Sequence, residues 1–147
     1  MRPQNTGVAL IGSARTPFLN TATAYSPLMS YELAAYAIEG VMQRCPSVID
    51  DLGLVVLGTV LHEINTTNVA REAMLKAGLS SRIPAYTVAM AGISPNVGVS
   101  NICDMIRLGR LKVGLAGGTD NFSDVPIRLS QPVRRSAMKL RNQHHIS

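Results

Sequence analysis

Apolar and polar positions along this chain fall into blocks whose period switches repeatedly between that of a strand and that of a helix. Short apolar runs bounded by glycine or polar loops are typical of strands buried on both faces, and apolar residues at helical spacing predict amphipathic helices. The predicted strands are residues 7–12, 53–60, 83–90 and 111–116, and the predicted helices are residues 31–44, 65–77 and 95–108. Such strict alternation predicts an α/β fold of three layers, a mostly parallel sheet with helices on both faces.

Residues at the ends of these helices support their boundaries. Ser30 is the expected N-cap of the first helix, which Pro46 brings to an end. Gly78 and Gly109 are placed to close the second and third helices.

The net charge lies at the C-terminal end. Residues 1–124 hold nine Lys and Arg against nine Asp and Glu, so the whole +5 comes from residues 125–147. The chain is long enough for one core. We therefore predict a domain over 1–124 and a basic C-terminal extension over 125–147.

The extension is itself a candidate binding element. Val133, Ala137 and Leu140 predict one apolar face of a short helix that starts near Pro132. Anionic lipid, RNA or an acidic protein would all suit such a helix, and so would plain solvent. We expect it to dock on an acidic partner surface, through Arg134, Arg135, Lys139 and Arg141.

The remaining composition argues against several classes of site. Cys45 and Cys103 have no metal-ligand spacing, and no secretory signal is visible, which favours reduced thiols inside a cell. Residues 1–6 look too short for a targeting presequence, and no apolar run approaches the ~20 residues of a membrane span. We expect a surface role for His62, a disordered terminus at His144 and His145, and no metal site.

The most informative residue is Gly92. Residues 82–100 (RIPAYTVAMAGISPNVGVS) lead from a strand through a tight corner into a helix. Such an elbow presents one side chain beside a helix N-terminus, whose dipole favours a thiolate and a developing oxyanion. Glycine there offers only its backbone N–H and is expected for its conformational freedom. Ser94, with no histidine to activate it, is expected to cap the helix, and Cys103 is too far along that helix to replace the nucleophile.

Four stretches resemble, in order, the N-terminal half of the thiolases, the enzymes that cleave or form 3-ketoacyl-CoA. They are residues 8–18 (VALIGSARTPF), 68–78 (NVAREAMLKAG), 87–94 (TVAMAGIS) and 115–123 (LAGGTDNFS). Ordered agreement over residues 7–141 is far more specific than one motif. Residues 57–71, 90–96 and 123–128 are most similar to the mitochondrial thiolases of fatty-acid oxidation.

The resemblance implies a half-fold that lacks the loop domain, the second half and their catalytic histidine and cysteine. It places Gly92 where the family has its nucleophilic cysteine, so no catalytic residue is expected in this chain. Other departures are Pro95 and Gly98 in the helix start, Asp120 for a glutamate and Phe122 for a methionine. Binding of CoA is doubtful without the loop domain, and no cofactor is expected.

Two further segments are candidates for contacts. Residues 117–118 could suggest a phosphate loop, but a packing turn explains them better because the other loop residues are missing. Capping of the second helix explains Asn65, Thr66, Thr67 and Asn68. The resemblance adds a place at a dimer interface for them and for Arg71, which we expect in an ion pair.

The main functional hypothesis is a catalytically degenerate thiolase-like protein that serves as a structural subunit of a larger, mitochondrial complex. One alternative is a fragment of an acyl-CoA acyltransferase of fatty-acid β-oxidation. The other is a regulatory partner of an active thiolase. Half a thiolase core leaves a sheet edge and a helix face uncovered, so a hetero-oligomer or a thiolase-like dimer is expected.

Overall fold

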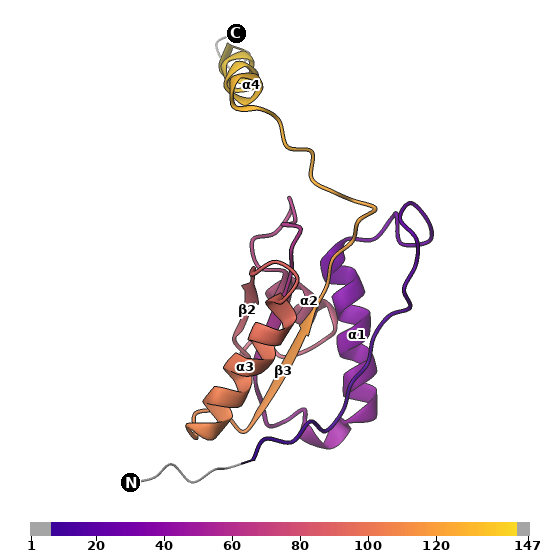
Figure 1. Cartoon of the computed structure of the whole chain (residues 1–147), viewed down its shortest axis with the longest axis vertical. Helices are drawn as coiled ribbons and strands as arrows, with labels where there is room; N and C mark the ends of the chain where they lie inside the picture. The colour runs from indigo at the N-terminus through magenta and orange to yellow at the C-terminus, as the bar shows by residue number, and fades with distance from the viewer. Residues whose placement is uncertain (1–6, 144–147) are drawn as a thin grey trace.

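A computed structural model describes residues 7–143, with side chains through 141, and shows four α-helices and three strands in this range (Figure 1). The predictions for His144, His145 and the first six residues lie outside the described residues. The elements are α1 (Ser30–Arg44), a 3₁₀ turn η1 (Pro46–Val48), β1 (Leu52–Gly58), α2 (Val69–Lys76), β2 (Ala85–Val88), α3 (Ser94–Arg107), β3 (Val113–Gly118) and α4 (Gln131–Gln143).

The sheet is parallel, with the order β2-β1-β3. Along the central strand β1, Val55 and Leu57 pack with α1 and α2, whereas Leu54 and Val56 pack with Ile102 of α3. Successive side chains of a strand point to opposite faces, so this strand, buried on both sides, joins two cores. The predicted three-layer α/β arrangement is confirmed (Figure 1).

The predicted first strand is wrong. Residues 7–12 have no strand structure, and Leu10 is 90% exposed. Side chains at the end of α1 bond to carbonyls here and just beyond, since Cys45 Sγ lies 3.6 Å from the Ile11 oxygen and Arg44 donates to the Ser13 oxygen. An apolar run becomes a strand only where a neighbouring strand completes its hydrogen bonds.

The outer edge of β3 has no partner strand within the described part of the chain, because β3 pairs with β1 alone. The expectation of an uncovered sheet edge concerns this side of β3. Apolar side chains are also exposed on the α3 layer, where Val99 is 49% and Leu108 67% accessible. An uncovered edge and uncovered apolar side chains are features that folded proteins generally cover.

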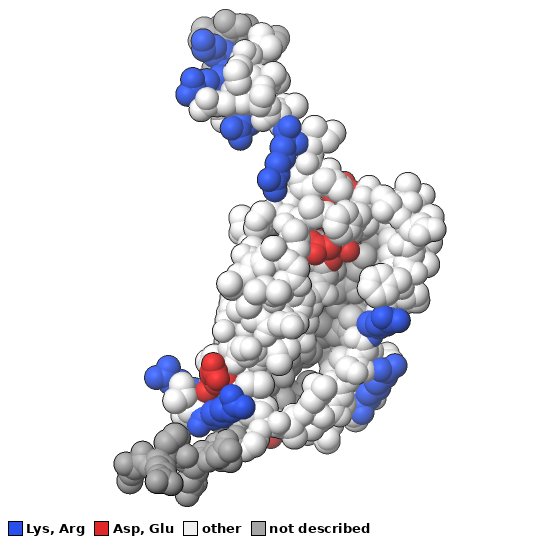
Figure 2. Space-filling view, viewed as in Figure 1, with Lys and Arg blue, Asp and Glu red and all other residues white. Residues whose placement is uncertain are grey.

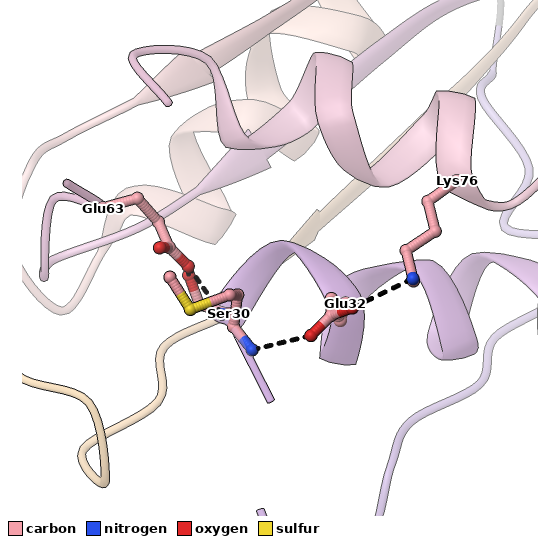
Figure 3. Close-up of polar contacts among 5 residues, drawn as sticks. Ser30, Glu32, Glu63 and Lys76 are labelled. Atoms are coloured by element: carbon pink, nitrogen blue, oxygen red, sulfur yellow. Dashed lines mark hydrogen bonds and ion pairs between the residues drawn. The ribbon is translucent and has the colours of Figure 1, made fainter. Parts of the chain in front are cut away.

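The N-terminus of α1 is held from outside the helix, which corrects the expectation for Ser30. Met29 is the N-cap, and its N–H donates to Glu32 Oε2 at 2.9 Å. Ser30 is the first helical residue, and its N–H (2.6 Å) and its hydroxyl both donate to Glu63 Oε1 (Figure 3). A carboxylate from the loop after β1 therefore accepts from the first N–H of the helix and also from the hydroxyl that was expected to cap it.

Glu32 also joins α1 to α2. Its Oε1 lies 2.9 Å from Lys76 Nζ (Figure 3). The hydrogen bond from the Met29 N–H, followed by the Lys76 ammonium, lowers the pKa of Glu32, and Glu32 raises the pKa of Lys76. Each shift favours the charged form, so the pair supports helix packing between acid and alkaline extremes.

The other boundaries follow local rules. Gly78 and Gly109 have φ of 81° and 69°, the left-handed conformation expected just after α2 and α3. Helix α2 starts later than predicted because Asn68, not Asn65, is its cap. Strand β2 is shorter than predicted because the Met90 N–H bonds to Ser94 Oγ at 2.7 Å and the chain already turns there. Among the described residues no helix is long and apolar enough to cross a membrane.

Candidate functional site

A cavity of about 490 Å³ opens where the carboxyl ends of β1 and β3 meet the N-terminus of α3. Its walls are residues 15–21, 58–60 and 118–123, with Tyr25, Leu33, Ala91, Gly92, Ser94 and Pro95. The carboxyl ends of parallel strands are where open α/β sheets bind their ligands. The elbow singled out in the sequence therefore lies on the wall of this cavity.

The elbow is built around Ser94, which is wholly buried. Its Oγ accepts from the Met90 N–H at 2.7 Å and lies 2.6 Å from the Ala91 oxygen, to which it can donate. The N-cap of α3 is Ile93, so Ser94 is not the helix cap that the sequence suggested. Because Ser94 is the first residue of the helix, its hydroxyl points toward the preceding residues and links the start of α3 to Met90 and Ala91. Ala91 takes the strained conformation there, with φ of 50°.

Gly92 differs from the expectation for a glycine at a corner. Its φ lies outside the left-handed region, and a Cβ built on it would have no neighbouring atom within 4 Å. The special conformation belongs to Ala91 instead. Neither backbone conformation nor close packing requires glycine at position 92.

Two other glycines of the cavity wall are required by packing. A Cβ at Gly58 would lie 2.6 Å from backbone atoms of Ser94 and Pro95, and one at Gly118 would overlap the Pro95 ring. The ends of β1 and β3 thus press against the first turn of α3. Gly117 and Gly118 serve packing, as predicted, although they belong to strand β3 and form no turn.

Asp120 ties the ends of two strands together. Its Oδ1 accepts from the N–H groups of Val60 (2.9 Å) and Leu61 (2.8 Å) and from the Thr59 hydroxyl (3.0 Å). These three donors lie in the loop that follows β1. The carboxylate is therefore occupied by structural hydrogen bonds, a role that the sequence did not reveal.

Asn121 is a second residue that the sequence reasoning missed. Its side chain is 6% exposed, and Nδ2 donates to the oxygens of Tyr25 (2.9 Å) and Leu28 (2.6 Å). Nearby, Ser123 Oγ accepts from the Ala22 N–H at 3.0 Å. These bonds hold the loop before α1 against the end of β3, and so shape the mouth of the cavity.

The segment before α2 lies apart from the residues that line the cavity. Asn68 Oδ1 accepts from the Arg71 N–H at 3.1 Å, and its Nδ2 donates to the Ala85 oxygen at 3.0 Å. Thr66 Oγ1 accepts from the Asn68 N–H, while Asn65 and Thr67 are exposed. The capping role is thus confirmed for Asn68, with Thr66 in support.

Arg71 forms no ion pair among the described residues, contrary to expectation. Its guanidinium donates to the carbonyl oxygens of Ile83 and Ser81, each at 2.9 Å. It therefore fastens the loop that leads into β2. Within residues 7–141 no carboxylate lies at ion-pair distance from Arg71, and carbonyl oxygens accept from its guanidinium instead.

The other candidates do not converge on the cavity. His62 is exposed, as expected, and Cys45 and Cys103 are half-buried free thiols outside the cavity lining. The side chains of Arg134, Arg135, Lys139 and Arg141 on α4 are exposed and also lie outside the lining. In the described range, no group of three or more metal-ligating side chains comes together.

Comparison with known proteins relates this architecture to a protein family. The model of the thiolase N-terminal domain family matches residues 8–146. The chain is 39% identical over 139 residues to the mitochondrial trifunctional enzyme subunit beta of Bos taurus, and 36% identical over 131 residues to a probable 3-ketoacyl-CoA thiolase of Caenorhabditis elegans. These alignments cover 95% and 89% of this chain, but only 29% of each relative.

A solved structure agrees with these relatives. The acetyl-CoA acetyltransferase of Bacillus anthracis superposes with a TM-score of 0.76 at 26% identity, over 82% of this chain and 30% of that one. The chain thus spans less than a third of the length of these relatives. With its parallel sheet, its elbow and its ordered motifs, the chain belongs to the thiolase family and corresponds to the N-terminal domain.

Proposed function

We propose that this chain contributes the N-terminal part of an acyl-CoA acyltransferase site of the 3-ketoacyl-CoA thiolase type, in mitochondrial fatty-acid oxidation, without supplying the acyl-accepting nucleophile. Membership of the thiolase family supports the reaction class. The name of the bovine relative supports the mitochondrial assignment. The remainder of such a site would come from polypeptide beyond these residues.

The observation that carries the proposal is the open position at Gly92. The residue lines the cavity beside the first turn of α3, its φ suits any amino acid, and a Cβ would point into unoccupied space. The elbow thus retains room for the side chain that the family resemblance places there. No atom of residue 92 can form a thioester with an acyl group, because glycine has no side chain.

The chemistry left to the elbow is electrostatic. A thioester carbonyl bound against the first turn of α3 would face the positive end of the helix dipole, which stabilises developing negative charge. The chain would therefore orient and polarise an acyl-CoA, and transfer would need a nucleophile and a base from elsewhere. This division of labour predicts binding without turnover.

The test compares the natural chain with Gly92→Cys. Neither protein should cleave acetoacetyl-CoA with free CoA, because the resemblance places the base and the second cysteine outside the segment that residues 1–147 resemble. The new thiol should nevertheless react with iodoacetamide at a midpoint pH below the ordinary thiol pKa of about 8.5, because of the adjacent helix N-terminus.

Peptide mass mapping separates this thiol from Cys103, an internal control farther along α3. An identical pH midpoint at both positions would show that the elbow does not activate a thiol. Thiolysis by the natural chain above a protein-free blank would contradict the absence of a nucleophile.

A structural subunit is the second candidate, and the open edge of β3 favours it. In this case the protein would add its half-domain to a hetero-oligomer, and acyl-CoA would not bind. Equilibrium dialysis with acetoacetyl-CoA distinguishes the two candidates, since saturable binding supports the acyltransferase site and its absence supports the structural role.

A further inference from the structure

Helix α4 differs in charge and burial from the rest of the molecule. It follows an extended segment and stands away from the sheet, and each of its described side chains is exposed (Figure 1). Figure 2 shows Lys and Arg side chains gathered at this end with no Asp or Glu among them. No acid follows Asp124 in the sequence. None of the ion pairs found in the described range involves an α4 cation.

Three apolar residues of α4 form a narrow seam. Val133, Ala137 and Leu140 are spaced i, i+4 and i+7, which places them on one side of the helix. Val133 is 49% and Leu140 60% exposed, so nothing in the described part of the chain covers the seam. Helices that bind in a groove of another protein use anchors at this spacing.

The cations flank the seam and continue around the rest of the helix. Arg134 and Arg141 lie on one side of it and Lys139 on the other, by the 100° turn per residue of an α-helix. Three of the four cations are arginines, whose planar guanidinium groups pair with carboxylates through two parallel hydrogen bonds. The helix therefore presents an apolar seam with a cationic border.

The same features identify the kind of partner. A helix that lies in a bilayer surface has a broad apolar face, commonly with aromatic residues, whereas this seam holds three aliphatic side chains and the helix has no aromatic residue. Binding to nucleic acid phosphates is carried by cations and does not require an apolar seam. We propose that α4 is a docking helix that inserts Val133, Ala137 and Leu140 into an apolar groove of a partner protein whose rim is acidic.

This inference is independent of the proposed acyl-CoA site, because no residue of α4 lines the cavity. The seam would supply the water-excluding centre of the interface, and the cations would supply its orientation and rate of encounter. The affinity of such an interface depends on both the seam and the cations, whereas the affinity of a purely ionic interface depends on the cations alone.

Calcium-loaded calmodulin serves as a defined test groove, because it binds basic amphipathic helices and is not put forward as the physiological partner. Labelled calmodulin is titrated with the full chain and three variants. The first is Val133→Ser with Leu140→Ser, the second is the matched control Met138→Ser, and the third replaces Arg134, Arg135, Lys139 and Arg141 with glutamine. Met138 lies on the far side of α4 from the seam and is 61% exposed.

The seam variant and the glutamine variant should each lose at least about tenfold in affinity, and Met138→Ser should stay within about twofold of the natural chain. Mixed phosphatidylcholine and phosphatidylserine vesicles and poly(U) RNA are titrated in the same buffer. Tighter binding to either, or equal affinity of the seam variant and Met138→Ser, would overturn the proposal. Circular dichroism confirms that each variant keeps its helix content, and an affinity loss with unchanged helicity supports a docking role.

Discussion

The ends of the strands and the elbow line the same cavity, yet they use glycine in opposite ways. At Gly58 and Gly118 a side chain would collide with the first turn of α3, so glycine is a condition of the packing. At Gly92 a side chain would meet nothing, and the backbone conformation is open to any residue. The comparison separates glycines that packing requires from a glycine that neither packing nor backbone conformation requires, because only the first kind has atoms where a Cβ would lie.

This difference has a functional meaning. The tight contacts keep α3 in position against the sheet, and so preserve the geometry of the elbow whatever residue stands at 92. In the proposed acyltransferase site, the chain would therefore keep the scaffold of a nucleophile position without the nucleophile. Substitutions at the two kinds of glycine should separate stability from chemistry.

The largest effect is expected from Gly58→Ala. The new methyl group would lie 2.6 Å from backbone atoms of Ser94 and Pro95, which cannot move without shifting α3. Overpacking of this kind costs about 1–3 kcal/mol. Urea denaturation monitored by circular dichroism measures the free energy of unfolding.

Gly92→Ala is the matched control. Alanine there should leave stability unchanged or raise it by about 0.4–1 kcal/mol, because it restricts the unfolded chain at no steric cost. If the two variants lost similar stability, the distinction between packed and open glycines would be wrong.

A comparable but more local effect is expected from Asn121→Ala. The variant leaves the Tyr25 and Leu28 carbonyls without their amide donor, and loss of a buried partner costs about 1–3 kcal/mol. Amide hydrogen exchange should accelerate in the loop before α1 and stay unchanged in β1.

Asn101→Ala removes an exposed side-chain bond to the Tyr86 hydroxyl and serves as control. Uniform acceleration over the whole domain would show that Asn121 supports global stability and does not specifically hold the cavity mouth.

Local sequence signals predicted much of the fold. The central strand β1 was visible as a continuous apolar run. Gly78 and Gly109 marked the ends of α2 and α3, because the backbone there takes a positive φ that glycine adopts without strain. The equally apolar residues 7–12 gave a wrong strand prediction, because in the described sheet they pair with no neighbouring strand. Whether such a run enters a sheet depends on contacts that local pattern does not contain.

The candidate site divides in the same way. The elbow at Gly92 was predictable, because a strand, a tight corner and a helix start follow one another within a few residues. The role of Asn121 was not, because its partners Tyr25 and Leu28 lie 96 and 93 residues earlier in the chain. Sequence reasoning also expected Ser94 to cap α3, since a difference of one residue in the helix start decides where its hydroxyl points.

The smallest effect concerns the Glu32–Lys76 pair, remote from both kinds of glycine. The pKa of Glu32 is lowered from its ordinary value of 4.5, so its stabilising contribution is present above pH 4.5 and is lost as the pH falls through the folded-state pKa. The pKa of Lys76 is raised from 10.5, so its contribution is present below pH 10.5 and is lost as the pH rises through the folded-state pKa. Both contributions are therefore complete between these limits.

Lys76→Met should lower the midpoint of thermal unfolding slightly at neutral pH, and this difference from the natural chain should shrink as Glu32 is protonated at acid pH. The effect is small because the Lys76 side chain is 42% exposed, and water and salt screen such pairs. Lys112→Met is the control, since Lys112 lies 3.6 Å from Asp51 with both side chains more exposed, and it should leave the midpoint unchanged. If the Lys76→Met difference stayed constant down to the acid limit, apolar packing of the lysine stem would explain the contact between α1 and α2, and the charge pair would contribute nothing.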